Sequence, residues 1–202
     1  MKIDVKDLDC DFLVFSGHKI YGPTGTGIIF GKESLLSILK PVRLGGGMIE
    51  KVSLEETTFT TIPNIFEAGT PNIEGVLGLK AALEYVQSIG LEKIYEYEKY
   101  LTEYTYSKLK TIRGLNQYCS DNIGHIGVFS FNVEGIHPHD LAQMLDESNI
   151  CVRAGHHCAQ ILHKDILKVS ASLRVSLSFY NDTSDIDVLI EKINEAQARL
   201  KS

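Results

Sequence analysis

The sequence predicts an α/β protein, and three segments carry that prediction. Residues 128–133 alternate apolar and polar side chains, as a half-buried strand does. Residues 138–147 predict a helix, and residues 182–200 predict an amphipathic helix that begins at candidate capping residues. Strands that alternate with helices indicate an α/β sandwich in this part of the chain.

The earlier elements follow in chain order. The apolar runs at 11–15 and 27–30 predict two short buried strands, joined by a connection rich in glycine. Residues 41–69 show no sustained period and predict a long loop, which in a compact protein is usually functional or interfacial. Helical spacing of apolar residues predicts a helix from a cap at Asn72 to Gly90, and a second helix covers 91–112.

Two further strands are expected at 150–152 and 174–179. Residues 91–202 therefore contain enough strands and helices for a core of their own. Residues 1–90 contain only two strands and one long helix, which is few for an independent core, because strands buried on both faces need neighbours. We therefore expect two domains, 1–90 and 91–202.

Composition excludes several classes of protein. The chain has 202 residues, with 20 Lys plus Arg against 26 Asp plus Glu, a net charge of −6. Without a basic run, neither nucleic acid nor an anionic membrane is an expected partner. No apolar stretch approaches the roughly 20 residues of a membrane helix, and residues 1–7 lack the features of a signal peptide. No Cys-x-x-Cys pair occurs, so we expect a reducing, cytoplasmic setting for Cys10, Cys119, Cys151 and Cys158.

Lys19 is the first candidate for chemistry. It lies in Ser16-Gly17-His18-Lys19, directly after a predicted strand and inside a glycine-rich turn. A lysine held rigidly in such a turn can direct its amine into a cleft and form a Schiff base with an aldehyde. Taken alone, the same residues also fit an ordinary solvated loop lysine.

The segment from Arg153 to Gln160 is the second candidate. Here Cys158 follows two imidazoles and lies near a guanidinium, surroundings that stabilise a nucleophilic thiolate. A zinc site formed by His156, His157 and Cys158 is an alternative, but adjacent ligands are not the usual zinc spacing, so no metal is expected. A buried structural cysteine is the plainer alternative.

Two anion-binding candidates complete the set. Arg174 lies in a predicted strand, where a fixed guanidinium can hold a carboxylate in a bidentate pair; a surface arginine explains it equally well. Gly69 and Thr70 precede the predicted helix that begins after Asn72, and a helix start is a ready phosphate site. An ordinary capping turn accounts for the same residues.

Together, these segments resemble the C-terminal half of a pyridoxal phosphate (PLP)-dependent cysteine desulfurase. The similarity is to the branch of the class-V aminotransferases that includes selenocysteine lyases and SufS-like enzymes, and its segments occur in family order over nearly the whole chain. It departs from the family after Gln160, where Ile161 replaces a frequent proline. The matching stretches are Leu8 to Phe12, Phe15 to Gly25, Phe66 to Asn72, Arg153 to Gln160 and Leu173 to Ser176.

The resemblance implies PLP-dependent transferase fold type I. Residues 1–90 would be the end of the large domain, and 91–202 the small domain with the cysteine loop. Lys19 would bind PLP as a Schiff base, and Cys158 would be the nucleophile that forms a persulfide. The remaining roles implied are phosphate contacts from Ser16 and His18, contacts from Gly69 and Thr70 to the phosphate of a neighbouring subunit, substrate-carboxylate binding by Arg174, and shaping of the pocket by Arg153.

The implied reaction removes sulfur from L-cysteine, or selenium from L-selenocysteine, and leaves alanine. The implied partners are a second copy of the chain and a sulfur-acceptor protein of iron–sulfur cluster assembly. In the family, an acid and a ring-stacking histidine precede the lysine by tens of residues, whereas here only 18 residues precede Lys19. We therefore expect an N-terminally truncated form with little activity by itself. The alternative is a non-catalytic fragment, or a dimerisation or sulfur-acceptor module.

Overall fold

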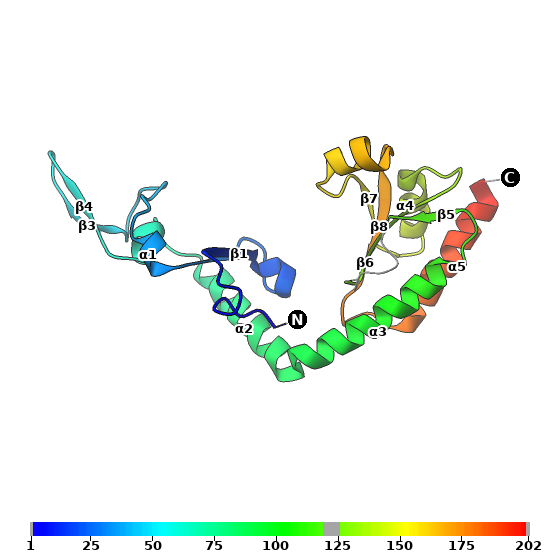
Figure 1. Ribbon diagram of the computed structural model, residues 1–202, viewed down its shortest axis with the longest axis horizontal. Coiled ribbons are helices and arrows are strands. Elements are labelled where there is room, and N and C mark those ends of the chain that lie inside the picture. Colours follow the sequence, from blue (N-terminus) through cyan, green and yellow to red (C-terminus); the bar gives the residue numbers. More distant parts are fainter. Residues whose placement is uncertain (1, 119–125, 201–202) are drawn as a thin grey trace. The chain divides into compact units, whose positions relative to one another are not determined.

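The computed structural model describes residues 2–118 and 126–200 of the chain (Figure 1). It divides into two compact units, Met1–Leu91 and Glu92–Ser202. Cys119, which the sequence leaves as a core or surface residue, lies outside the described residues.

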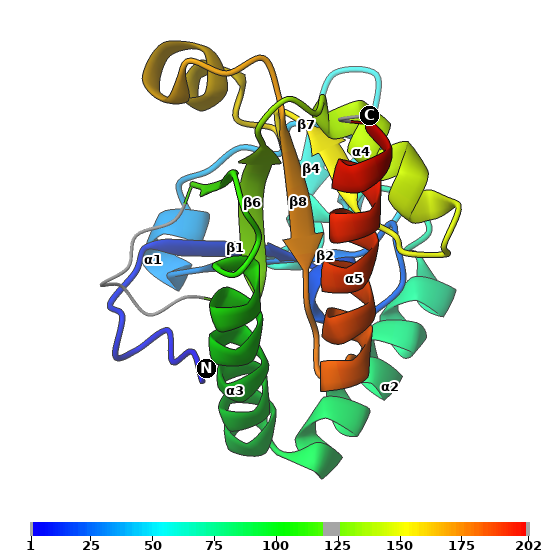
Figure 2. The ribbon, with the colours of Figure 1, turned by 90° about the vertical axis from the view of Figure 1, so that its right-hand side faces the viewer.

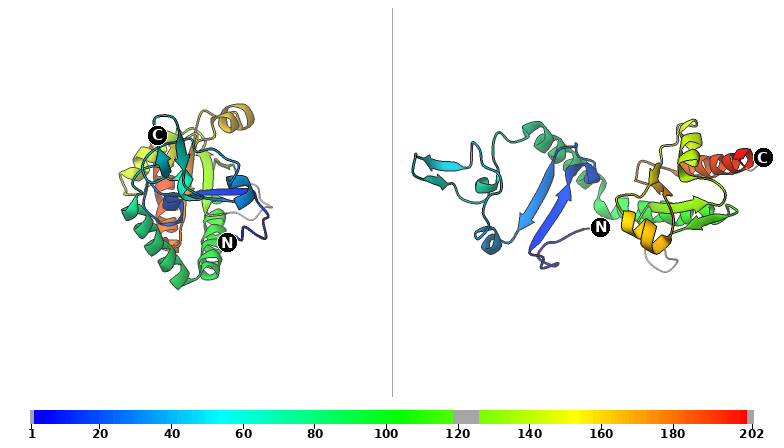
Figure 3. Two further views of the ribbon diagram at one scale, coloured as in Figure 1. Left: turned by 90° about the vertical axis from the view of Figure 1, so that its left-hand side faces the viewer. Right: turned by 90° about the horizontal axis from the view of Figure 1, so that it is seen from above.

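Unit 1 begins with a two-stranded antiparallel ribbon (Figure 3). Strand β1 (Phe12–Ser16) pairs with β2 (Gly27–Gly31), with Ser16 opposite Gly27. Both apolar runs are strands, as predicted. Their predicted burial is wrong, because Val14 and Ile29 are 66% and 70% exposed. In the part of the chain that the structure describes, β1 and β2 form a sheet of their own, so their apolar faces are left in solvent.

The stretch 41–69 is more ordered than its sequence predicts. It contains an antiparallel hairpin of β3 (Ile49–Val52) and β4 (Thr57–Phe59), followed by the short 3-10 helix η2 (Asn64–Phe66). The strands have three or four residues each and an irregular register, so they give no clear period in the sequence. A short helix, α1 (Glu33–Leu36), follows β2 and also was not predicted.

Helix α2 (Ile73–Ile89) confirms the prediction made from its cap. The side chain of Asn72 accepts a hydrogen bond from the Gly75 amide at 3.0 Å, which satisfies one of the free amides of the first turn. Gly90 follows the last turn with φ of 97°, a conformation that glycine adopts without strain. Leu79 is buried on the inner face of α2.

Unit 2 contains a four-stranded antiparallel sheet with the strand order β5-β6-β8-β7. The strand predicted at 128–133 is confirmed, and the one predicted at 174–179 begins and ends earlier. The prediction at 150–152 is wrong, because the edge strand begins at Arg153. The strands are β5 (Leu115–Gln117), β6 (Val128–Val133), β7 (Arg153–Gly155) and β8 (Ser172–Ser176).

Three helices pack on one face of this sheet: α3 (Leu91–Leu109), α4 (Pro138–Asp146) and α5 (Thr183–Leu200) (Figure 2). Alternate residues of the strands, among them Phe129 and Phe131, are fully buried against the helices. The side chains between them leave the opposite face of the sheet, as strand geometry requires. None of the described helices is long and apolar enough to span a membrane.

Candidate functional site

In unit 1, Lys19 lies on one turn of 3-10 helix, η1 (Gly17–Ile20), that starts where β1 ends. Ser16 is the residue before the turn, and its side chain does not cap it. His18 and Lys19 are both exposed, so the amine is open to a ligand. The structure therefore places these three predicted site residues on one short segment.

Backbone hydrogen bonds hold this turn at both ends. The Gly17 amide donates to the Thr26 carbonyl at 2.9 Å, and the Gly22 amide donates to the Gly17 carbonyl at 2.9 Å. A Cβ atom on Gly17 would collide with the Thr26 hydroxyl, and one on Gly22 would lie 2.8 Å from a methyl group of Leu79 in α2. The two glycines therefore let the segment around Lys19 pack closely against its own loop and against α2.

Gly69 and Thr70 lie just before α2, and Asn72 ties this segment to the loop that follows Lys19. The Asn72 side-chain amide donates to the Gly25 carbonyl at 3.3 Å, while its oxygen caps α2. Gly69 has φ of 86°, its amide donates to the Gly46 carbonyl at 2.8 Å, and a Cβ atom there would meet no atom within 4 Å. Gly69 is thus exposed, with open space beside its α carbon and its amide bonded to Gly46.

In unit 2, the sheet face away from the helices carries the candidate arginines. Arg153 on β7 lies directly opposite Arg174 on β8. Cross-strand partners project from the same face of a sheet, so both guanidinium groups lie on the open side. The Nε atom of Arg174 is buried and has no hydrogen-bond partner within the described structure.

Cys158 lies in the loop after β7. Its side chain is exposed, and an Arg153 guanidinium nitrogen (Nη2) donates to the Cys158 Sγ atom at 3.5 Å. Cys158 and His157 have φ of 64° and 53°, the left-handed region that few residues other than glycine adopt. The structure therefore brings Cys158 and Arg153 together, with the loop in an uncommon conformation.

His157 lies close to both arginines. Partial burial is the main cause that lowers its pKa, and the positive charge of Arg174, the neighbouring His163 and Arg153 lower it further. A hydrogen bond to the carbonyl of Ser172 opposes this shift. His157 is therefore held in the neutral form at neutral pH.

Sequence reasoning missed two polar residues behind this loop. His163 is 3% exposed and Ser172 is fully buried, and the His163 Nε2 atom lies 2.8 Å from the Ser172 hydroxyl oxygen. His163 lies in the π-helix η3 (Leu162–Leu167), an element that no periodicity in the sequence indicates. The available signal was the departure from the family pattern at 161–163, which ends in this histidine.

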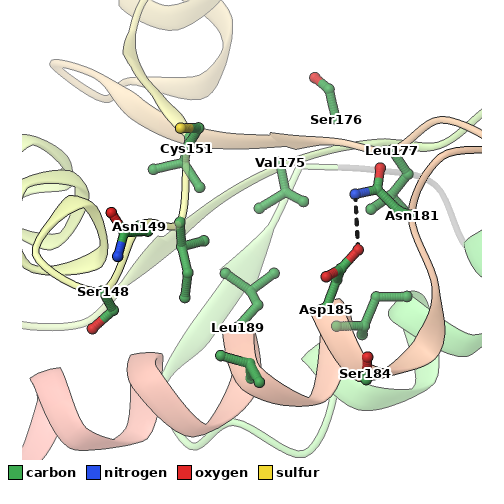
Figure 4. A pocket seen from close by; sticks show the side chains of 14 residues that line it. Ser148, Asn149, Cys151, Val175, Ser176, Leu177, Asn181, Ser184, Asp185 and Leu189 are labelled. Atoms are coloured by element: carbon green, nitrogen blue, oxygen red, sulfur yellow. Dashed lines mark hydrogen bonds between the residues drawn. The ribbon is translucent and has the colours of Figure 1, made fainter.

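A separate cavity of about 430 Å³ lies on the helix side of unit 2 (Figure 4). Val175 and Leu189 line it together with Cys151, and an Asn181 to Asp185 hydrogen bond of 3.1 Å borders it. It includes none of the predicted site residues. Nowhere in residues 2–118 and 126–200 do three His, Cys, Asp or Glu side chains gather in a way that could hold a metal ion.

Comparison with known proteins identifies the family. Residues 1–189 match the family described as "Aminotransferase class-V". A cysteine desulfurase of Wigglesworthia glossinidia brevipalpis is 45% identical over 202 residues, all of this chain and 48% of that protein. The chain therefore spans about half the length of the curated relatives it matches.

Two solved structures show the same fold. The cysteine desulfurase CsdA of Escherichia coli matches 96% of this chain and 48% of its own, with a TM-score of 0.90 and 37% identity. The apo cysteine desulfurase of Thermococcus onnurineus matches 96% of this chain and 49% of its own, with a TM-score of 0.92 and 41% identity. The predicted α/β fold of PLP-dependent transferases is confirmed. This chain belongs to the class-V aminotransferase family.

Proposed function

We propose that this chain contributes the PLP lysine, the sulfur-accepting cysteine and the carboxylate-binding arginine of a cysteine desulfurase. The substrate would be L-cysteine or L-selenocysteine. The observation that carries the proposal is the arrangement of Arg153, Arg174 and Cys158 in unit 2. A thiol next to one guanidinium, on a sheet face shared with a second, suits attack on the sulfur of an amino acid whose carboxylate is held.

The residues of unit 1 fit PLP. Lys19 offers an exposed amine on a turn that two backbone hydrogen bonds hold in place. Ser16 and His18 precede it on the same segment and would contact the phosphate. PLP, when bound, supplies an electron sink for the bonds around the substrate's α carbon. Lys19 would hold the cofactor aldehyde and then move the proton at the α carbon as general base and acid.

Arg174 would hold the substrate carboxylate. Its buried Nε atom lacks an acceptor, and a carboxylate supplies two oxygens in the geometry of a guanidinium. Charge-assisted hydrogen bonds of this kind are worth about 1.5–3 kcal/mol each. Arg153, which donates to Cys158, would keep the sulfur on the same face.

The sulfur transfer that these residues would perform is balanced in atoms and electrons. The Cys158 thiolate attacks the substrate Sγ atom, an S–S bond forms, and the substrate Cβ–Sγ bond breaks. The bonding pair stays on the carbon side, which is protonated and released as alanine. Cys158 keeps the sulfur as a persulfide, and a sulfur-acceptor protein with its own thiol would collect it.

We propose that the working assembly is a homodimer in the cytoplasm. Residues 1–90 would belong to its large domain, and 91–202 would form its small domain. Gly69 and Thr70 would reach the cofactor phosphate of the second copy, because both are exposed just before α2. Acceptor, substrate and second copy are the partners of this proposal.

The cofactor site can be tested by trapping. The purified chain is incubated with PLP, treated with borohydride to reduce any Schiff base, and digested. The masses of the peptides are then measured by mass spectrometry. We expect the reduced cofactor on Lys19. Lys19→Ala should abolish this adduct, and Lys40→Ala, which removes another exposed lysine, should keep it. Trapping spread over many lysines would contradict the assignment.

The reaction can be tested on the same samples by alanine formation from L-cysteine with a reducing thiol. Cys158→Ala should abolish alanine and the persulfide, whereas Cys151→Ala, which removes another exposed cysteine, should not change them. Equal alanine formation by Cys158→Ala and the unaltered chain would refute the role of Cys158. A chain that traps PLP on Lys19 without forming alanine would supply only part of the active site.

A further inference from the structure

The two residues on either side of Cys158 are fastened to the same buried pair. Before the cysteine, the His157 Nε2 atom lies 3.0 Å from the Ser172 Oγ atom and 3.1 Å from the Ser172 carbonyl oxygen. After it, the Ala159 carbonyl accepts from the His163 Nδ1 atom at 3.0 Å and from the His163 backbone amide at 3.1 Å. The Ser172 to His163 contact of 2.8 Å joins the two sides.

The carbonyl oxygens at the two ends of this hydrogen-bond network fix the positions of two protons. Carbonyl oxygens only accept, so His157 carries its proton on Nε2 and His163 carries its proton on Nδ1. In this Nδ1–H tautomer the Nε2 atom of His163 is an acceptor, and the Ser172 hydroxyl donates to it. The same hydroxyl oxygen is then free to accept from His157.

One detail agrees with this assignment. With the proton on Nε2, the Nδ1 atom of His157 carries a lone pair and no hydrogen. That Nδ1 atom is buried and has no partner within the described residues. A second proton on His157 would place an unpaired N–H there, next to Arg174 and Arg153, whose charges already lower the pKa of this histidine.

Burial makes the hydrogen bonds of this network important for the cysteine loop. His163 and Ser172 are shielded from solvent, so water does not replace a hydrogen bond that is lost between them. His157 and Cys158 both have left-handed backbones, which persist only where the surroundings hold them. Within the described structure, the His157 side chain contacts Ser172 by hydrogen bonds and the His163 ring edge-on at 5.5 Å between centroids, and the Cys158 side chain contacts Arg153.

We propose that His163, which donates from Nδ1 to the Ala159 carbonyl, is a positioning residue for Cys158 and acts through Ser172 and His157. It holds the residues before and after the cysteine, and so keeps the thiol beside Arg153. The hydrogen-bond chain is independent of the reaction, and only its consequence for sulfur transfer rests on the proposed function. His163 itself touches neither Cys158 nor any reacting atom.

The assignment can be tested on the unaltered chain. Two-bond ¹⁵N–¹H correlation spectra of the histidine rings distinguish the two neutral tautomers. We expect His163 to be the Nδ1–H tautomer and His157 to be the Nε2–H tautomer at neutral pH. An Nε2–H or doubly protonated His163 there would overturn the proposal, and no variant needs to fold for this result.

Hydrogen exchange tests the positioning. The Ala159 amide, which donates to the His156 carbonyl at 2.8 Å, reports on the cysteine loop, and the Phe131 amide in β6 reports on unit 2 as a whole. We expect His163→Phe to accelerate exchange at Ala159 about tenfold and to leave Phe131 unchanged. Equal acceleration at both amides would show a general loss of stability and overturn the specific role.

A double variant tests whether the hydrogen bonds of His163 and Ser172 act as one connected network or as independent contacts. His163→Phe and Ser172→Ala both remove the Ser172–His163 hydrogen bond, so the acceleration of Ala159 exchange in His163→Phe/Ser172→Ala should be smaller than the product of the two single effects. Multiplying effects would overturn the proposal. His139→Phe, which alters an exposed histidine outside the network, should leave the exchange at Ala159 unchanged. In a chain that forms alanine, His163→Phe should lower kcat without raising KM, since Arg174 remains.

Discussion

Arg153 and Arg174 stand directly opposite each other on β7 and β8, and both side chains leave the sheet on the face away from the helices. No carboxylate forms an ion pair with either of them within residues 2–118 and 126–200. Two guanidinium groups without a counter-ion create a local positive potential next to Cys158, although the whole chain is acidic. An anionic reagent or substrate should therefore be drawn to this face.

The first prediction concerns the reactivity of Cys158. Removing one guanidinium by Arg174→Gln should lower the ratio of its alkylation rates by iodoacetate and by neutral iodoacetamide. A unit charge acting over several ångströms in water changes such a ratio by about two- to threefold. The rates are measured by mass spectrometry of the Cys158 peptide. The Cys151 peptide of the same sample is the internal control, and an equal change there would count against the prediction.

The second prediction concerns the turn that carries Lys19. Gly17→Ala places a Cβ atom on the Thr26 hydroxyl, so it should destabilise the turn by about 1–3 kcal/mol, as overpacking does. Exchange of the Gly22 amide, which donates to the Gly17 carbonyl, measures the change. Adding Thr26→Ala removes that hydroxyl and should restore part of the protection. If the double variant is no better than Gly17→Ala, steric conflict with Thr26 is not the cause.

The third prediction separates the two hydrogen bonds of Asn72. Asn72→Ala loses the cap of α2 and the bond to the Gly25 carbonyl, and should cost about 1 kcal/mol at the start of α2. Asn72→Asp keeps a capping oxygen and loses only the donor, so it should retain most of the protection of the Gly75 amide. Hydrogen exchange at Gly75 is the measurement. Equal losses in both variants would mean that the bond to Gly25, and not the cap, holds this end of the helix.

The fourth prediction is a pH dependence that comes from His157. Its pKa is lowered from the ordinary 6.5, chiefly by burial and then by Arg174. Below 6.5 the unfolded chain binds a proton that the folded chain still excludes. The contribution of His157 to stability is therefore complete above about 6.5, and is lost as the pH falls through the lowered folded value.

Urea unfolding of the chain between pH 7.5 and 5, followed by NMR at the Phe131 amide, measures this slope. His157→Gln keeps a donor for Ser172 but does not titrate, so its stability should fall less steeply over the same range. An NMR titration that gives His157 a pKa above 6.5 would contradict the sign of the prediction.

Much of the fold could be predicted because some segments carry local signals. The cap at Asn72 and the glycine at 90 mark both ends of α2, and the alternation at 128–133 marks β6. The hairpin of β3 and β4 could not be predicted, because its strands are too short and too irregular to show a period. The edge strand was misplaced by three residues, since an apolar run at 150–152 precedes it and β7 itself contains an arginine and a glycine.

The candidate site could be predicted where its reactive residues lie close together in the sequence or next to a predicted strand. Lys19 follows a strand directly, and Cys158 shares its segment with Arg153. The His163 and Ser172 pair was not predictable from spacing, because it depends on the π-helix η3, which brings a histidine back over a residue nine positions later. A hydrogen bond between two elements needs the tertiary structure, and neither residue has a periodic signal of its own.

The exposed ribbon of β1 and β2 has a practical consequence for anyone who handles this chain. In the described residues the two strands pair only with each other, five residues to a strand, and apolar side chains such as Val14 and Ile29 stay in water. Their outer edges present unpaired backbone amides next to an exposed apolar surface. Strands of other molecules can pair with such an edge. Aggregation during concentration of the purified chain should therefore start at this ribbon. A single Val14→Lys change should raise the solubility of the chain and leave the turn of Lys19 intact.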